Sequence, residues 1–258
     1  MIRSDYKWLT DIFVAHRGLF NNKDVPENSV PAFRLAAQKG YGIETDVQAT
    51  KDGVPVIFHD DTMERMTGAV GRIQDYTYDE LKQFRLLDTD CKIPTLADFL
   101  AAADNANIIV EIKDHDNIGD LEQKTYRALK CYKGNYCVES FNPMIIRWFK
   151  VNAPEVIRGT LSCSYKGSKM SAFRRWLLAN LKLCKWNGSQ FIAYDVMSVR
   201  NNKAVQRFAK KIPIICWTVN SQEKYDEYRD CFDNIIFDSF EPIRYDLETT
   251  TRQPNVDE

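Results

Sequence analysis

The sequence lacks the features that would place it in a membrane or in an oxidising compartment. None of its apolar runs approaches the roughly 20 residues that a transmembrane helix needs, and its first 18 residues carry charges throughout, so we expect no signal peptide. The seven cysteines are odd in number and scattered, without a CxxC pair, which disfavours a disulfide framework or a thiolate zinc site. We therefore expect reduced thiols and a cytoplasmic location.

The chain also has little net charge and few histidines. Its formal charge is −1, so no global field recruits nucleic acid, and we expect no nucleic-acid partner. Only three histidines occur in 258 residues. The 44% apolar and 28% charged fractions are those of an ordinary globular protein, and the length suits one α/β barrel.

Short β-rich runs recur along the chain, and most are separated by stretches with helical signals. The candidate strands are 12–16, 42–47, 54–59, 107–113, 135–141, 156–161, 190–196, 212–219 and 234–238. The candidate helices are 30–39, 77–84, 95–103, 120–131, 143–152, 171–185, 200–210 and 221–231. Regular alternation of this kind predicts parallel strands with crossover helices, here a (β/α)₈ barrel of the TIM type.

Two irregularities interrupt this alternation. Nine candidate strands compete for eight barrel positions, so one of them is misassigned or peripheral, and the joint 47–54 is too short for a crossover helix. Residues 61–94 contain no convincing strand, and we interpret them as a small inserted subdomain after the third strand, over one mouth of the barrel. The chain is otherwise predicted to be one domain, 1–258, with a frayed polar tail over 247–258.

Polar side chains end several otherwise apolar strands. These are His16 with Arg17, Glu44 with Asp46, His59 with Asp60, and Glu111 with Lys113. Such groups are costly inside a barrel unless they are paired or bound to a cation. Because active sites of parallel barrels lie at the carboxyl ends of the strands, four such endings predict that the groups converge on one site.

The carboxylates in this set suggest a metal site. Alternate residues of a strand share one face, so Glu44 and Asp46 point the same way. Together with Glu111 they would repel one another unless a hard divalent cation, Ca²⁺ or Mg²⁺, lay between them. Glu44 or Asp46 alone could equally be a salt-bridged barrel residue. A glycosidase carboxylate pair is a further interpretation, but it leaves the histidines unexplained.

His16 and His59 both lie at predicted strand ends. Imidazole titrates near neutrality, so two of them can supply a base and an acid on opposite sides of a phosphorus centre. The third, His115, lies in a polar loop and is interpreted as a packed or surface residue.

These residues occur within a longer series of motifs that resembles the glycerophosphodiester phosphodiesterases, relatives of the phosphatidylinositol-specific phospholipases C. The series runs in family order over residues 12–242, and its members are specific together although each is weak alone. The motifs are HRG (16–18), PENS (26–29), AF (32–33), ETDVQATKDGVPVIFHD (44–60), R-x-TG (65–68), IPTLADFL (93–100), EIK (111–113), ESF (139–141), WTVN (217–220) and D-x-x-EP (238–242).

The resemblance implies an enzyme that hydrolyses glycerophosphodiesters to glycerol phosphate and an alcohol. On the matching positions, His16 and His59 would be the acid–base pair, and one divalent ion would be held by the carboxylates. The metal ligands implied are Glu44, Asp46 and Glu111. The resemblance further implies that Arg17 and Lys113 bind phosphate and that Asn28 braces the HRG loop.

Two other functions remain compatible with the motifs. One is phospholipase D-like or C-like action on lysolipids or phosphoinositides, which needs a lipid-accepting cavity. The other is a catalytically silent phosphodiester-binding module, which the loss of a histidine or metal ligand would indicate, and none is lost here. Trp217 either walls the substrate cavity or belongs to the core.

The chain departs from the family pattern in two places. Ser29 replaces the usual threonine after Glu27 and Asn28, a change that preserves helix capping. The closing segment NIIFDSFEP replaces a more glycine-rich pattern, which leaves the contribution of the final strand to substrate binding open.

A basic stretch lies outside these motifs. Residues 156–194 contain no acidic residue but seven Lys and Arg, and Phe173, Trp176, Leu177, Leu181 and Cys184 predict an apolar helical stripe beside them. One interpretation is a barrel helix with a basic outer face. The other is a lid or interfacial helix that makes peripheral membrane contact.

Overall fold

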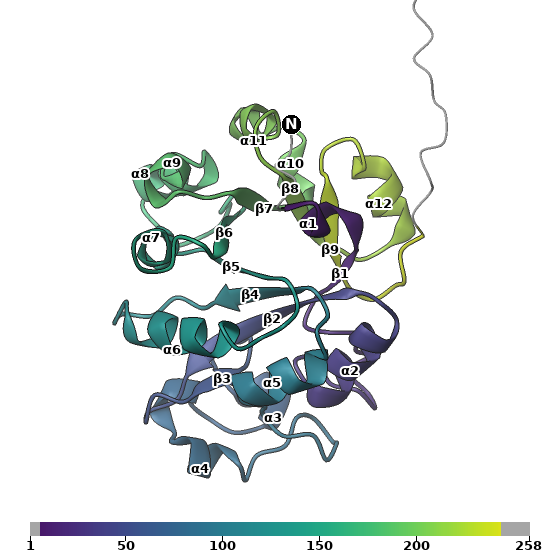
Figure 1. The fold of residues 1–258 in the computed structure, drawn as a ribbon, viewed down its shortest axis with the longest axis vertical. Coiled ribbons are helices and arrows are strands. Elements are labelled where there is room, and N and C mark those ends of the chain that lie inside the picture. The colour runs from purple at the N-terminus through teal and green to yellow at the C-terminus, as the bar shows by residue number, and fades with distance from the viewer. Residues whose placement is uncertain (1–5, 244–258) are drawn as a thin grey trace, which may run out of the picture.

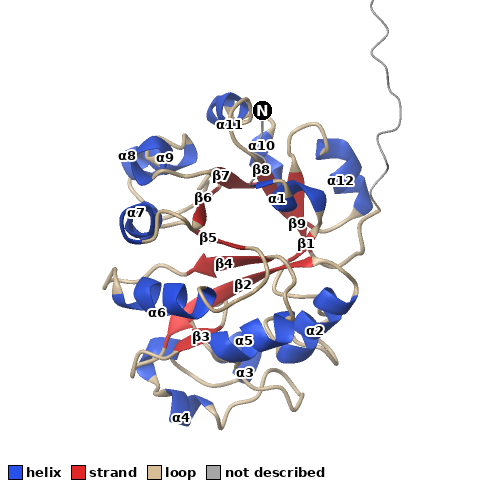
Figure 2. Ribbon diagram, viewed as in Figure 1, coloured by secondary structure: helices blue, strands red, loops and turns tan. Residues whose placement is uncertain are grey.

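The computed structural model describes residues 6–243, and its strands form a closed parallel barrel with helices outside (Figures 1 and 2). The strands are β1 (Val14–Ala15), β2 (Gly42–Ala49), β3 (Pro55–Ile57), β4 (Ile108–Ile112), β5 (Tyr136–Ser140), β6 (Ile157–Ser162), β7 (Phe191–Asp195), β8 (Ile214–Val219) and β9 (Asn234–Phe237). All except β3 pair in parallel, and β1 closes the ring by pairing with both β2 and β9. The prediction of a TIM-type barrel is confirmed. The expected frayed tail, 247–258, lies outside the described residues.

The strand β3 is the ninth candidate that does not belong to the barrel. It pairs antiparallel with β2, with Val47 opposite Ile57. The connection is a tight turn in which the Gly53 N–H donates to Thr50 O at 2.8 Å, and Gly53 adopts a φ of 76° that favours glycine. The helix that appeared to be missing between 47 and 54 is absent because this joint is a hairpin.

Helices occupy most of the predicted positions, and several begin at residues whose side chains cap them. They are α1 (Trp8–Asp11), α2 (Val30–Gln38), α3 (Glu64–Thr67), α4 (Tyr78–Leu81), α5 (Leu96–Ala103), α6 (Asp120–Leu129), α7 (Pro143–Asn152), α8 (Ala172–Ala179), α9 (Cys184–Asn187), α10 (Val196–Val199), α11 (Lys203–Phe208) and α12 (Gln222–Tyr228), with one 3₁₀ turn, η2 (Ile73–Asp75). The Ser29 side chain caps α2, and Thr95 forms a capping box with Asp98 at α5. Within residues 6–243, no helix has the length and hydrophobicity to cross a bilayer.

The prediction of a single helix over 171–185 is wrong. The chain forms α8 and α9 instead, separated where Leu181 takes a φ of 55°. Leu181 and Cys184 turn into the core, whereas Phe173 and Trp176 remain exposed. The expected apolar stripe is therefore divided between two faces.

The apolar core has an inner and an outer part. Inside the barrel, Val14, Ile109 and Phe191 pack against Leu9 of α1, and the Asn234 side chain donates to Leu9 O at 2.7 Å. These contacts place α1 across the amino-terminal end of the barrel. A larger cluster fills the layer between the strands and the helices. The carboxyl-terminal end of the barrel is left for polar side chains.

Residues 58–94 carry α3, η2 and α4, and they connect the hairpin to α5. Their apolar side chains form a cluster of their own, with Phe58, Met63 and Leu81 among its members. This segment lies below the barrel ring in Figure 1, alongside β3. It brings Arg65 to the edge of the site described next.

Candidate active site at the carboxyl end of the barrel

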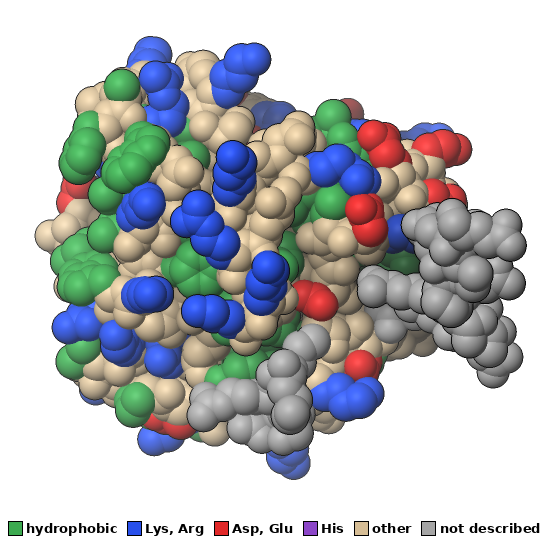
Figure 3. Space-filling model, turned by 90° about the horizontal axis from the view of Figure 1, so that it is seen from above, with side chains coloured by type: hydrophobic (Ala, Val, Ile, Leu, Met, Phe, Trp, Pro, Cys, Tyr) green, Lys and Arg blue, Asp and Glu red, His purple; other side chains and the backbone are tan. Residues whose placement is uncertain are grey.

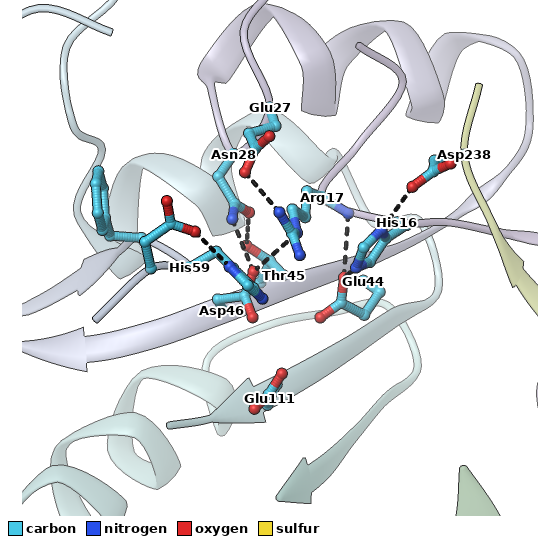
Figure 4. A network of polar contacts seen from close by, with 12 residues as sticks. His16, Arg17, Glu27, Asn28, Glu44, Thr45, Asp46, His59, Glu111 and Asp238 are labelled. Carbon is cyan, nitrogen blue, oxygen red and sulfur yellow. Dashed lines mark hydrogen bonds and ion pairs between the residues drawn. The ribbon is translucent and has the colours of Figure 1, made fainter. Parts of the chain in front are cut away.

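Three carboxylates converge at the carboxyl ends of β2 and β4. Asp46 lies opposite Glu111 in the parallel register, and Glu44 is on the same face of β2. All three side chains are buried, and each contributes an oxygen within 4.8 Å of the others (Figure 4). The residues thus form a set of oxygen donors of the kind that Ca²⁺ and Mg²⁺ prefer.

The positive charges nearby do not balance these carboxylates equally. Burial raises the pKa of Asp46, but Lys113, His59 and Arg17 outweigh burial, and the net pKa is lowered. Burial and the neighbouring carboxylates raise the pKa of Glu44 well above its usual value. Burial likewise raises the pKa of Glu111 to about 7, although Lys113 opposes the shift. Without a further cation, the charged forms of Glu44 and Glu111 therefore remain disfavoured, even though Lys113 lies beside Glu111.

His16 follows β1 and points toward the carboxylates. Its Nδ1 lies 3.1 Å from Asp238 Oδ2, just beyond β9, and its Nε2 lies 4.0 Å from Glu44 Oε2. A carboxylate at Nδ1 fixes the orientation of the ring and favours the proton on that nitrogen. Nε2 is then directed into the site.

His59 is held in the same manner on the other side of the cluster. Its Nδ1 lies 2.7 Å from the carboxylate of the adjacent Asp60. Burial lowers the pKa of His59, against the opposing effect of Asp46. Figure 4 shows His16 and His59 on either side of Glu44 and Asp46.

The HRG loop is fastened to the cluster through Arg17 and Asn28. The Arg17 backbone N–H donates to Glu44 Oε2 at 3.1 Å, and its guanidinium donates to Glu27 at 2.6 Å. Asn28 donates from Nδ2 to Asp46 at 2.8 Å and accepts from Thr45. The Arg17 guanidinium is thus already engaged, and its Nε, which has no hydrogen-bond partner among the described residues, lies 3.7 Å from Asp46 Oδ2.

Lys113 and Trp217 occupy different parts of the same edge. Lys113 Nζ lies 3.3 Å from Asp46 and 3.2 Å from Glu111. Trp217, on β8, contacts Phe141 edge to face at 5.5 Å and packs against the inner apolar cluster. Its Nε1 is buried without a partner among residues 6–243.

His115 is not brought to this site. Its Nε2 lies 3.0 Å from Glu122 Oε1, and Glu122 is fully buried in α6. The hydrogen bond that Glu122 accepts raises the pKa of His115. The expectation of a packed residue agrees with this ion pair.

Several charged residues around the site were not assigned a role from the sequence. Asp238 and Asp60 hold the two histidines, and Arg65 binds Asp60 and Glu27 together. Glu139 is buried opposite Glu111, and burial raises its pKa well above the usual value. The motifs HD, PENS, R-x-TG and D-x-x-EP contained four of these residues, but a motif does not state which side chains pair.

Comparison with known proteins identifies the family. A model of the glycerophosphoryl diester phosphodiesterase family matches residues 16–240. The chain belongs to this family. It is therefore a phosphoric diester hydrolase, and all the site residues named above lie within the matched range.

Named relatives and solved structures agree with membership of the glycerophosphoryl diester phosphodiesterase family. Glycerophosphodiester phosphodiesterase 1 of Bos taurus is 29% identical over 254 residues, covering 83% of this chain and 73% of that protein. A glycerophosphodiester phosphodiesterase of Caldanaerobacter subterraneus is 35% identical over 165 residues, or 58% of this chain and 66% of that one.

Two solved structures share the fold. A phosphodiesterase of Oleispira antarctica, in complex with the product sn-glycerol-3-phosphate, superposes with a TM-score of 0.76 at 22% identity, covering 91% of this chain and 94% of that one. A glycerophosphodiester phosphodiesterase of Parabacteroides distasonis gives a TM-score of 0.71 at 26% identity, covering 88% and 92%. The barrel is therefore the fold of this family.

Proposed function

We propose that the protein hydrolyses glycerophosphodiesters to glycerol phosphate and an alcohol, with one divalent metal ion and two catalytic histidines. The observation that carries the proposal is the pairing of each histidine with a carboxylate at Nδ1, on either side of the carboxylate cluster. The small-molecule substrate is also the one named for the relatives, and the Oleispira protein binds sn-glycerol-3-phosphate.

The metal proposal is supported by the charge at the cluster. Glu44, Asp46 and Glu111 would hold the ion, because their oxygens lie close together and burial raises the pKa of Glu44 and of Glu111 even with Lys113 beside Glu111. A hard ion such as Ca²⁺ or Mg²⁺ suits a donor set made only of oxygen. When bound, the ion would neutralise charge on the phosphate.

The side chains of this chain then bind substrate and move protons. One of His16 and His59 removes the proton from the attacking oxygen, and the other protonates the leaving oxygen. Each would act through Nε2, because Nδ1 faces Asp238 or Asp60. Lys113 and Arg17 would bind the phosphate oxygens.

Supporting residues keep these groups in place. Asn28 would brace the HRG loop through its contacts with Asp46 and Thr45. Trp217 would form part of the wall of the substrate cavity, since it lies at the same barrel edge and its Nε1 has no partner among the described residues. All seven cysteines are free thiols, which supports a cytoplasmic location.

A second candidate is phospholipase D-like or C-like action on lysolipids. The exposed aromatic side chains of α8 favour it, because they offer an apolar surface next to the loop that follows β6. A silent binding module is disfavoured, since both histidines and all three carboxylates are present. Phosphoinositides need the same lipid-accepting cavity as lysolipids.

The test is a product assay on a panel of glycerophosphodiesters, lysolipids and phosphoinositides, with EDTA treatment and metal add-back. We expect glycerol phosphate and a free alcohol from the soluble diesters, and the double variant His16→Ala/His59→Ala serves as the inactive control. Release of a phosphorylated alcohol instead would assign C-type cleavage. No product from any diester under any metal would overturn the proposal.

A further inference from the structure

The outer face of α8 carries exposed aromatic side chains that the proposed active site does not use. Phe173 is 71% exposed and Trp176 is 50% exposed, and their rings stack with centroids 6.2 Å apart. No residue of α8 is buried. A third exposed aromatic side chain, Trp186, lies nearby in the sequence on α9. Among the described residues, these three are the exposed large side chains of Phe or Trp.

Cations surround these rings without acidic partners. Lys182 Nζ lies 5.0 Å from the centroid of the Trp176 ring, and Arg147 lies 5.1 Å from that of Trp186. Within residues 6–243, no salt bridge joins any lysine or arginine of the segment 163–190 to an acid. Those cations are Lys166, Lys169, Arg174, Arg175, Lys182 and Lys185.

The separation of basic from acidic side chains is also visible on the molecular surface. In Figure 3, Lys, Arg and hydrophobic side chains share the left half of the face, the side of α8 and α9 in Figure 1, and acidic side chains gather on the right. Because the chain has a formal net charge of only −1, this positive field is local.

The position of α8 connects this face to the barrel mouth. The loop 163–171 leads from the carboxyl end of β6, the edge that holds the catalytic histidines, to the first turn of α8. Tyr165 of this loop contacts Phe141 at 6.3 Å, and Phe141 contacts Trp217 at 5.5 Å. A continuous row of aromatic rings thus runs from the loop before α8 to the site.

We propose that α8 and the loop 163–171 form an interfacial surface that docks the enzyme on bilayers of anionic phospholipid. Phe173 and Trp176 enter the headgroup layer, where aromatic side chains are favoured. The surrounding cations bind lipid phosphates. A bilayer fits better than a nucleic acid because the two rings stack on each other and lie on the outside of a helix, whereas bases need open ring faces in a groove.

Docking would present diester lipids to the barrel mouth, and this role of the surface rests on the proposed function. The docking itself is measured without turnover. The full chain is sedimented with vesicles of phosphatidylcholine alone or mixed with phosphatidylglycerol. Measurements at ionic strengths where the Debye length is about 30 Å and about 3 Å separate electrostatic from apolar binding. We expect binding only to the anionic vesicles, and less at high salt.

Two variants test the two contributions. Arg174→Glu/Arg175→Glu/Lys182→Glu removes three cations, each of which favours an anionic surface about five-fold, so we expect at least a roughly 100-fold loss of vesicle affinity. Phe173→Ser/Trp176→Ser should weaken binding and reduce quenching of tryptophan fluorescence by brominated lipid. Both should retain the melting temperature, because α8 buries no residue and Lys182, which follows α8, is exposed.

The matched control is Lys203→Glu/Arg207→Glu/Lys210→Glu, on α11 and the turn that follows it, which changes the net charge equally. Vesicle binding by this control at wild-type strength supports the proposal. Equal loss in the control, wild-type binding by the α8 charge variant, or no anionic binding at low salt overturns it, as does tighter binding to a single-stranded oligonucleotide than to vesicles. Turnover of a soluble glycerophosphodiester is assayed in parallel, so that a protein that docks but is inactive refutes only the proposed function.

Discussion

Arg65 joins the two loops that carry His16 and His59, the proposed catalytic histidines, and its replacement is the most informative single perturbation. Its guanidinium donates to both oxygens of Glu27, at 2.9 and 2.6 Å, and to both oxygens of Asp60, at 2.5 and 2.9 Å. Asp60 holds His59, and Glu27 holds Arg17 of the HRG loop. Arg65→Ala should therefore loosen both sides of the site together.

The expected loss of stability is moderate. Glu27 is buried, but it would keep its bonds to Arg17 and Asn22, so the cost stays below the roughly 3–5 kcal/mol of a stranded buried charge. Because the Arg65 side chain is 46% exposed, solvent screens part of the interaction. We expect about 1–2 kcal/mol, which lowers the melting temperature of a protein of this size by about 2–8 °C.

Activity should fall further than stability suggests. Small displacements of catalytic groups cost up to about 100-fold in rate, so Arg65→Ala should lower kcat about 10–100-fold. Arg65→Lys keeps the charge but lacks the planar guanidinium that bridges two carboxylates. Its kcat should therefore lie between those of the wild type and Arg65→Ala. Arg85→Ala is the matched control, because Arg85 pairs only with the fully exposed Asp90 at 3.0 Å and should alter neither quantity.

The pH dependence provides a separate check of the same network. Burial opposes ionisation of Glu27, but the hydrogen bonds from Arg65 and the charge of Arg17 lower its pKa from 4.5 to about 2. A carboxyl group whose pKa is lower in the folded protein stabilises the fold when the pH is above the pKa of the unfolded state. This stabilisation is lost as the pH falls toward the pKa of the folded state. The stability difference between wild type and Arg65→Ala should therefore be full above pH 4.5 and shrink toward pH 2. Urea unfolding at several pH values measures it, and a difference that stays constant down to pH 2, or unchanged kcat in Arg65→Ala, would refute this account.

The remaining predictions concern the metal and the histidines. EDTA should abolish activity and Ca²⁺ or Mg²⁺ should restore it, and undiminished turnover of a rigorously metal-free preparation would contradict the metal role. Glu44→Gln should weaken metal binding, measured by calorimetry, far more than it lowers the melting temperature, because its buried carboxylate lacks a compensating cation in the absence of the ion. His16→Ala and His59→Ala should each lower kcat by roughly 10²–10⁴-fold. His115→Ala should leave kcat nearly unchanged, since its partner is Glu122, and a crippled His115→Ala beside an active His59→Ala would overturn the assignment.

Most of the barrel could be predicted because its strands are buried on both faces and therefore appear as short apolar runs. The strand β3 has the same composition, and only the tight turn at Thr50–Gly53 decides that it folds back on β2 rather than entering the barrel. The break between α8 and α9 was missed for a related reason. Helical periodicity continues through Leu181, but tertiary packing draws that side chain inward.

Two of the metal-ligand candidates, Glu44 and Asp46, could be predicted because their spacing is local, on alternate residues of β2, and Glu111 because it ends an apolar strand. The pairs His16–Asp238 and Glu27–Arg65 differ in this respect. Asp238 lies 222 residues from His16, and Arg65 lies 38 residues from Glu27. Strand closure and the insertion bring these pairs together, and one sequence carries no pattern that reports such long-range pairing.

Backbone conformation gives independent support for a functional HRG loop. Arg17 and Asn28 both adopt positive φ values, 56° and 52°, where non-glycine residues cost of order 1 kcal/mol or more. Glycine at position 17 would relieve this cost but would remove the guanidinium that donates to Glu27. The Asn28 N–H donates to Arg17 O at 2.9 Å, so the two residues hold each other in place, and the Asn28 side chain fastens both to Asp46. A loop under selection for stability alone would not keep two such residues facing a cluster of buried carboxylates, whereas a loop that must present Arg17 and His16 to a phosphate has reason to.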